Sequence, residues 1–287
     1  MNIKPLLLAL SMALTSAPAF ADCLSDAEVA ALFAAYAART PAATPQGLSP
    51  ADGECSRAKL QGLLEKQFGK PVGYKAGLTN PAVQKRFNAT APVWGSLYAH
   101  MLLKDGAVVE ANFGARPLFE ADLLVRVADS AINDAKSPTD VMASISEVIP
   151  FIELPDLVVQ APPQLNGAAV TAINVGARLG VLGKAILVPS TRGERQALQD
   201  ALRDMVAIVK ADGVELDRGK GSDVLDHPLN AVVWLVQDLA RHGVRLKAGD
   251  LISLGSFSKL LPPKPGMAVD VVYEGLPGTP RVQVSFK

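Results

Sequence analysis

Residues 116–125, Arg-Pro-Leu-Phe-Glu-Ala-Asp-Leu-Leu-Val, place two acids inside an otherwise apolar stretch. In a β-strand the side chains alternate between two faces, which puts Glu120 and Asp122 on the same face. Both faces are mostly apolar, which predicts a strand buried on both sides. Two buried carboxylates cannot both stay ionised unless a cation or a basic side chain neutralises them. A divalent metal held by oxygen ligands meets that need. A strand at a sheet edge, with both acids facing water, is the alternative that this segment alone leaves open.

A third acid and a lysine stand in similarly apolar surroundings. Glu153 is the single acid in the run 148–155, Val-Ile-Pro-Phe-Ile-Glu-Leu-Pro, and is the candidate third ligand because a lone charge there needs a partner. Lys75 lies between Gly73 and Gly77, where glycine lets the backbone approach a ligand closely. Composition favours a Lys75 ammonium that reaches solvent over one paired with an anion. Ligands that are all carboxylates favour Mg²⁺ or Mn²⁺, with Ca²⁺ as an alternative, over zinc.

Composition and motifs exclude several classes of function. The 287 residues suit one large domain or two small ones, and 49% hydrophobic residues support a sizeable core. Lys+Arg and Asp+Glu both number 28, which gives no case for nucleic acid or an anionic membrane as partner. None of the three histidines has zinc-ligand spacing with another histidine or a cysteine, and His227, before Pro228 at a helix start, is expected to be structural. No serine-hydrolase elbow, phosphate loop or dinucleotide fingerprint occurs.

The first residues have the pattern of a secretory signal peptide. Lys4 supplies the positive start, residues 6–14 form a short apolar run, and Ala19-Phe-Ala21 has the small residues of a cleavage site. We expect residues 1–21 to be removed, and a periplasmic or secreted protein that starts near Asp22 and does not associate with the membrane. An uncleaved anchor is the alternative, although the run is too short to span a bilayer.

Cys23 and Cys55 are the only cysteines. In an oxidising compartment we expect them to form a disulfide that ties the first helix to the second and closes the Pro/Gly-rich segment 40–53. Two free thiols are the alternative. In either case both cysteines are expected to be structural, because no histidine near them in the sequence would activate them.

Periodicity and capping residues predict the following elements. Ser25 caps a helix over 26–39, and a second helix covers 56–68. Residues 168–182 are expected to form buried strands, and the charged segment 191–204 a surface excursion. Asp212-Gly213 indicates a hairpin turn. Further helices are expected at 80–87, 139–145 and 228–242, and further strands at 93–98, 107–111, 118–127, 251–254, 267–274 and 281–286.

Six short stretches then occur in one order: Gly-Tyr-Lys75-Ala-Gly-Leu-Thr, Ala82-Val-Gln84, Glu120-x-Asp122, Pro150-x-x-Glu153, His227-Pro-Leu-Asn230-Ala-Val-x-Trp234-Leu and Gly-Ser256-Phe-Ser258. This order resembles the 2-keto-4-pentenoate hydratase / 4-oxalocrotonate decarboxylase family, within the fumarylacetoacetate hydrolase superfamily, over roughly residues 56–287.

The resemblance implies an α+β fold, with a rolled mixed β-sheet of the fumarylacetoacetate hydrolase C-terminal type. A helical region at 22–70 would precede a metal-binding domain at 71–287. The resemblance also implies metal ligation by Glu120, Asp122 and Glu153, catalysis by Lys75, and assembly as a homo-oligomer. Substrate binding would fall to Leu78, Asn174, Ser256 and Ser258.

The implied function is that of a lyase, a hydratase or a decarboxylase, that acts on a small 2-keto or 2-hydroxydienoic acid through a metal-stabilised enolate. Two departures from the family pattern bear on this expectation: Val93 and Ile173 stand where the family has aspartates. Two alternatives are therefore retained. One is a non-catalytic periplasmic protein that binds a metal and a keto acid. The other is a hydrolase of acylpyruvates, for which no His–Glu pair is visible in the sequence.

Overall fold

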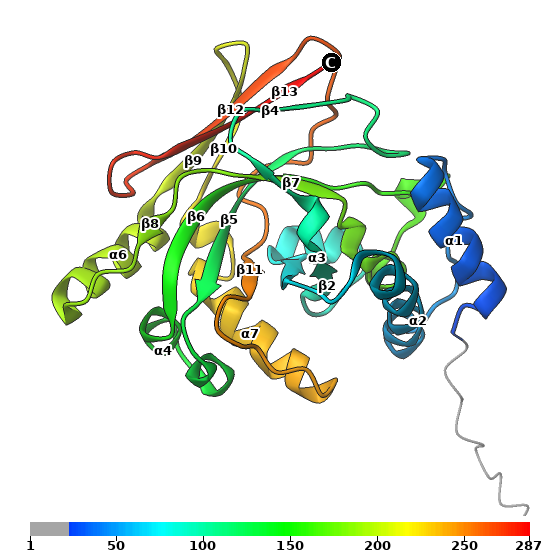
Figure 1. Ribbon diagram of the computed structural model, residues 1–287, viewed down its shortest axis with the longest axis horizontal. Coiled ribbons are helices and arrows are strands. Elements are labelled where there is room, and N and C mark those ends of the chain that lie inside the picture. The colour runs from blue at the N-terminus through cyan, green and yellow to red at the C-terminus, as the bar shows by residue number, and fades with distance from the viewer. Residues whose placement is uncertain (1–22) are drawn as a thin grey trace, which may run out of the picture.

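A computed structural model of the chain describes residues 23–287, so the expected signal peptide, residues 1–21, lies outside the described residues. The described part is an α+β fold, as the sequence predicted, and its strands form two β-sheets (Figure 1). The helices are α1 (Asp26–Ala38), α2 (Pro50–Phe68), α3 (Pro81–Arg86), α4 (Pro138–Ala143), α5 (Gly167–Ala172), α6 (Arg192–Asp204) and α7 (Pro228–Arg241).

The larger sheet has eight strands in the order β2-β1-β11-β5-β6-β7-β3, with β8 also paired to β6. It is mixed, because β1 runs parallel to β11 and β3 parallel to β7 while the other pairs are antiparallel. Its strands are β1 (Gly73–Gly77), β2 (Val93–Leu97), β3 (Leu102–Lys104), β5 (Glu120–Val127), β6 (Ile145–Leu154), β7 (Leu179–Leu182), β8 (Ile186–Leu187) and β11 (Leu251–Ser253).

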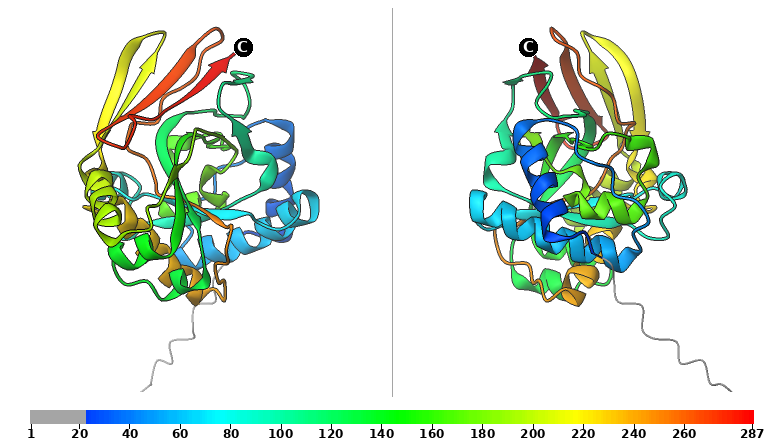
Figure 2. Two further views of the ribbon diagram at one scale, coloured as in Figure 1. Left: turned by 60° about the vertical axis from the view of Figure 1, so that its left-hand side comes forward. Right: turned by 90° about the vertical axis from the view of Figure 1, so that its right-hand side faces the viewer.

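A smaller, five-stranded sheet has the order β10-β9-β12-β13-β4. In Figure 2 its yellow, orange and red strands stand above the larger sheet, while α1 and α2, in blue, cover one flank. The Asp212-Gly213 turn joins β9 to β10 as a hairpin, as expected. The strands are β4 (Ala107–Val109), β9 (Val206–Ala211), β10 (Val214–Lys220), β12 (Ala268–Glu274) and β13 (Arg281–Phe286).

β5 divides the apolar core in two. Ala121, Leu123 and Val125 point into one hydrophobic cluster, which α7 and the smaller sheet also line. Leu124 points into a second cluster, which it shares with residues of α1, α2 and α5. The strand is therefore buried on both faces, as its sequence predicted, and the sheet-edge alternative is excluded. The N-terminal helices pack on the same core as the sheet.

Three expectations about local structure were wrong at particular segments. α2 begins at Pro50 rather than at residue 56, because Ser49 and Asp52 form a capping box. Residues 191–204 form α6, capped by Thr191, rather than a surface excursion. The charged composition hid an amphipathic helix whose Leu198 and Leu202, one turn apart, are buried.

Residues 167–176 form α5 and a 3₁₀ turn, and only β7 is a strand in the segment where buried strands were expected. A short apolar run does not distinguish a strand from a buried helix. Its small residues serve a close contact with α2: a Cβ added to Gly53 would lie 2.4 Å from the carbonyl oxygen of Ala168. Asn166 caps α5 through a 2.8 Å bond from the Ala169 amide.

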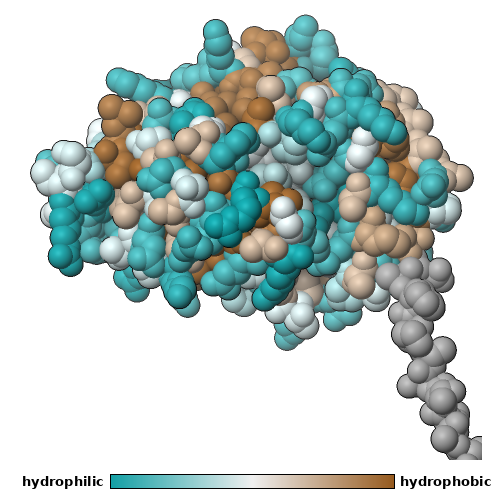
Figure 3. Space-filling model, turned by 60° about the horizontal axis from the view of Figure 1, so that its bottom comes forward, coloured by the Kyte–Doolittle hydropathy of each residue, from teal (hydrophilic) through white to brown (hydrophobic). Residues whose placement is uncertain are grey.

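No helix within residues 23–287 is both long and apolar enough to cross a bilayer. Figure 3 shows a largely hydrophilic surface on the face that it displays, with separate apolar patches between the polar side chains.

The structure joins Cys23 to Cys55, with their Cα atoms 5.7 Å apart, and so fastens the start of the described chain to α2. Leu24 adds a bond from its amide to Ser56 Oγ, 2.9 Å long. The cysteines are 32 residues apart in sequence. A covalent loop of that size reduces the entropy of the unfolded chain.

We predict that Cys55→Ser lowers the free energy of unfolding by about 3 kcal/mol through the loss of this constraint. Urea unfolding of the parent and the variant measures the difference, and a reductant should destabilise the parent but leave the variant unchanged. Two alkylatable thiols in the folded, non-reduced protein would contradict the disulfide.

Candidate functional site

Glu120 and Glu153 face each other across two hydrogen-bonded strands. β5 and β6 are antiparallel, and their register sets Glu120 directly opposite Glu153. Asp122 lies two residues further along β5 and therefore projects from the same face. The three carboxylates that the sequence singled out thus belong to one face of the larger sheet.

Lys75 joins this group from β1, two strands away from β5. It is in register with Ser253 of β11, which is in turn in register with Leu124 of β5, so its side chain projects from the face that carries Asp122. Its ammonium forms a hydrogen-bonded ion pair with Oε1 of Glu153. A second bond, 3.0 Å long, goes from Nζ to the carbonyl oxygen of Val175.

All four ionisable groups are buried. Their exposed fractions are 3% for Lys75, 8% for Glu120, 0% for Asp122 and 2% for Glu153. The expectation that Lys75 reaches solvent was therefore wrong. The residues that flank Lys75 in the sequence did not reveal its partner. That partner is a buried carboxylate, distant in sequence, which offsets the penalty of burying the ammonium.

Negative charge exceeds positive charge in this cluster. Burial raises the pKa of Glu120 well above its usual range, and the charge of Glu153 raises it further. Burial likewise raises the pKa of Asp122 to about 7, with Glu153 again adding to the effect. One ammonium is not enough to keep three adjacent carboxylates ionised.

The carboxylate of Asp122 is held by protein donors. Ser253 Oγ donates to it at 2.5 Å, and the amides of Gly255 and Leu123 donate at 3.1 and 2.6 Å. Sequence reasoning missed Ser253, because one serine in a short apolar strand gives no signal of its own.

Tyr273 is another supporting residue that the sequence did not reveal. Its buried hydroxyl donates to the carbonyl oxygen of Asp122 and also lies 2.9 Å from the carbonyl oxygen of Phe151 on the adjacent strand. This contact comes from β12 of the smaller sheet, so it ties the two sheets together directly behind the acids. A tyrosine within an alternating strand pattern could have suggested burial but not this partner.

The carbonyl group of Val175, the second partner of Lys75, belongs to a strained turn of the backbone. Asn174 and Val175 both have positive φ, 54° and 53°. For a β-branched residue such as Val175 this conformation costs about 1–3 kcal/mol and suggests a functional constraint. The carbonyl that it orients is the one that accepts from Lys75.

Asn174 holds this strained turn against β2. Its Oδ1 accepts from the amide of Ser96 at 2.7 Å, and its Nδ2 donates to the carbonyl of Ser96 at 3.0 Å. Both polar groups of the side chain are thus bonded to backbone, which gives Asn174 a positioning role. A direct contact with substrate stays a prediction.

The other residues expected to bind substrate lie in loops. Ser256 is near enough to Glu120 for its hydroxyl to oppose the rise in the pKa of that acid. Ser258 Oγ accepts from the amide of Ala121 at 2.9 Å. Leu78 follows β1 with φ 54°, and its carbonyl accepts from Gln84. The structure thus places the two serines beside β5, whereas a binding role for Leu78 rests on the resemblance alone.

The residues present fit a divalent cation. Three carboxylates and one ammonium leave an excess of two negative charges when all are ionised, and Oε2 of Glu153 is buried without a hydrogen-bond partner in the described structure. An oxygen-only set of donors suits Mg²⁺, Mn²⁺ or Ca²⁺. Glu120 and Glu153, which the strand register sets opposite each other, are the candidate ligands, while Asp122 is already engaged by Ser253 and Gly255.

Comparison with known proteins gives independent information. No family model matches the chain. The 2-keto-4-pentenoate hydratase 2 of Dechloromonas aromatica (strain RCB) is 30% identical over 205 residues, 71% of this chain and 75% of the relative. The 4-oxalocrotonate decarboxylase of Pseudomonas putida is 27% identical over 227 residues, 79% of this chain and 82% of the relative.

A solved structure shares the fold. The 4-oxalocrotonate decarboxylase from Pseudomonas putida G7, complexed with magnesium and adipate, superimposes with a TM-score of 0.77 at 24% identity, over 92% of this chain and 99% of that one. The expected fold class is thereby confirmed. On the sequence similarity, the chain belongs to the family of 2-keto-4-pentenoate hydratases and 4-oxalocrotonate decarboxylases.

Proposed function

We propose that the protein is a divalent-metal-dependent lyase that acts on a small 2-keto or 2-hydroxydienoic acid, by adding water or by releasing carbon dioxide. The observation that carries this proposal is the buried cluster of Glu120, Asp122 and Glu153 beside Lys75. Relatives named as hydratases and as a decarboxylase cover most of the chain, and a decarboxylase of this fold was solved with magnesium.

The roles of the residues follow from their positions. Glu120 and Glu153 would hold the ion, and Ser253 and Gly255 fix Asp122 beside them. When bound, the ion supplies Lewis-acid polarisation of the substrate's keto oxygen. The Lys75 ammonium, held by Glu153 and Val175, places a positive charge where negative charge develops on the substrate. Burial makes that charge more effective than it would be in water.

One observation favours a second candidate function, a binding protein that does not catalyse. Val93 stands where the family has an aspartate, and by register it lies on the same face of the sheet as Lys75, where a Cβ added to Gly77 would contact both Val93 and Val175. A proton donor at that position is therefore replaced by apolar surface. Turnover assays distinguish the two candidates.

Hydrolysis of acylpyruvates has less support. It calls for a base that activates water, often a histidine. His227 instead caps α7, where its Nδ1 accepts from the amide of Leu229 at 3.0 Å. This is the structural role expected for it. His100 stacks on Phe68, and His242 lies between α2 and α7.

We also propose that the protein is exported, because residues 1–21 have the pattern of a signal peptide and the Cys23–Cys55 pair suits an oxidising compartment. Identification of a mature N-terminus near Asp22 in the periplasmic or secreted fraction would support this. A reduced, full-length protein in the cytoplasm would contradict it. Assembly as a homo-oligomer remains a proposal that rests on the resemblance.

We predict that Glu153→Gln weakens Mg²⁺ binding by more than about ten-fold, because the variant removes a direct ligand charge and even outer partners of a metal contribute about that much. Calorimetric titration measures the affinity. Glu147→Gln is the matched control, since Glu147 is on the same strand but pairs with Arg126 at the surface. A Glu153→Gln variant that binds Mg²⁺ as tightly as the parent would remove Glu153 from the site.

We predict that Lys75→Ala lowers turnover of the active substrate by about 10²-fold or more, because it removes a preorganised charge. The assay would screen 2-keto and 2-hydroxydienoic acids, including oxaloacetate, with Mg²⁺ or Mn²⁺, and EDTA should abolish activity. Lys70→Ala is the control, because that lysine precedes β1 and is exposed. Ligand-dependent thermal stabilisation without turnover of any acid would favour the binding protein instead.

We predict that Mg²⁺ affinity rises with pH. Asp122 has a pKa raised to about 7, and the pKa of Glu120 is raised as well, so both bind protons that a metal must displace. For the metal-free protein, a raised acid pKa gives stability that is present at low pH and is lost as the pH rises towards about 7. Thermal unfolding with EDTA should show this loss, and Asp122→Asn should reduce it. An affinity that does not change between about pH 6 and 8 would contradict the prediction.

A further inference from the structure

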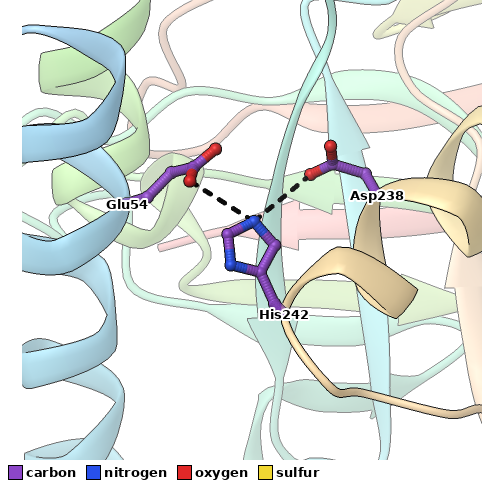
Figure 4. Close-up of side chains that lie close together, drawn as sticks. All are labelled: Glu54, Asp238 and His242. Carbon is purple, nitrogen blue, oxygen red and sulfur yellow. Dashed lines mark ion pairs between the residues drawn. The ribbon is translucent and has the colours of Figure 1, made fainter.

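A second group of possible metal ligands lies away from the acidic cluster, between α2 and α7. It consists of Glu54 on α2, Asp238 on α7 and His242 at the end of α7 (Figure 4). Nε2 of His242 lies 3.4 Å from Oε2 of Glu54 and 3.7 Å from Oδ2 of Asp238. Their ligand atoms all lie within 4.8 Å of one another. Among residues 23–287, no other group of three His, Cys, Asp or Glu side chains meets this distance.

The two separations from Nε2 of His242 are close to those between ligand atoms in a tetrahedral site. Bonds of about 2.1 Å to a tetrahedral ion place neighbouring ligand atoms about 3.4 Å apart. Asp238 and His242 are four residues apart, so they project from the same side of α7. A histidine nitrogen with two carboxylates suits zinc or a similar transition metal, in contrast to the oxygen-only set around Glu120.

The ligand group is supported from outside, as metal ligands usually are. Trp94 Nε1 donates to Oδ2 of Asp238 at 2.8 Å, and Arg241 Nη1 donates to Oδ1 at 3.1 Å. The Trp94 ring also meets the His242 ring edge to face, with centroids 5.6 Å apart. The indole of Trp94, on the edge strand β2 of the larger sheet, thus holds both Asp238 and His242 in position.

A cavity of about 320 Å³ adjoins the group. Glu54, Asp238 and Trp94 line it, and a fourth ligand, water or a small molecule, could enter from it. Among the ion pairs of the described residues, Glu54 has one partner, His242. Arg57, stacked over the Trp94 ring 3.4 Å from its centroid, offsets part of the negative charge, so we expect moderate rather than extreme affinity.

We propose that Glu54, Asp238 and His242 form a second metal site, specific for zinc or a similar transition metal, that clamps α2 to α7. It is independent of the proposed lyase site, since it shares no ligand with it. Because α2 also carries Cys55, the clamp and the disulfide would fix the same helix to two different parts of the fold.

Trp94 provides a local probe, because the chain has two tryptophans and the other, Trp234, can be replaced. In a Trp234→Phe background, Zn²⁺ added in the presence of saturating Mg²⁺ should change the emission of Trp94 with a stoichiometry of one. His242→Gln and Glu54→Gln should each weaken this response at least about ten-fold. Zn²⁺ should also raise the melting temperature of the parent but not of His242→Gln.

Two control variants decide between this site and others. His100→Gln replaces an exposed histidine elsewhere and should leave Zn²⁺ binding unchanged, and Glu153→Gln should do the same. Loss of the response in Glu153→Gln would assign zinc to the acidic cluster and overturn the proposal. So would the absence of a saturable response, an equal loss in His100→Gln, or a His242→Gln variant that retains the parent's affinity.

Discussion

The burial of excess negative charge on one face of the larger sheet is the constraint on which the rest of the site depends. Glu120, Asp122 and Glu153 are nearly inaccessible to solvent, and Lys75 neutralises one of them. Removing such groups from water is unfavourable unless partners compensate for it. The remaining charge matches that of a divalent ion, and this is why the structure favours metal-assisted chemistry over a role for these acids in folding alone.

Several features of the fold serve to hold these charges. β5 and β6 set two of the carboxylates opposite each other, β11 contributes Ser253, and β1 brings Lys75 from the far side of β11. Tyr273 reaches from the smaller sheet to the backbone of β5 and β6. The strained turn at Asn174 and Val175 completes the surroundings of Lys75. Such strain persists where the surrounding contacts fix the backbone, and it is common at active sites.

The same chain carries a second set of ligand-type residues with a different chemical character. The acidic cluster is deeply buried and has oxygen donors only, whereas Glu54, Asp238 and His242 are partly accessible and include a nitrogen. Hard and borderline cations would therefore distribute between the two sets according to donor type. The disulfide at Cys55 and the contacts of His242 both act on α2, the helix that the packing of Gly53 against Ala168 brings close to the core.

The sequence by itself determined the elements with strong local signals. These are the capped helix after Ser25, the hairpin at Asp212-Gly213 and the alternation of β5, because caps, turns and period-two patterns are local properties. Together with the order of its motifs, it also identified the family and singled out the three acids that the fold buries on one face of the larger sheet. Only the tertiary structure decided that residues 167–172 are helical, that Lys75 is buried against Glu153, and that Glu54 meets His242. Each of these depends on a partner far away in sequence, whose desolvation and packing override the local preference.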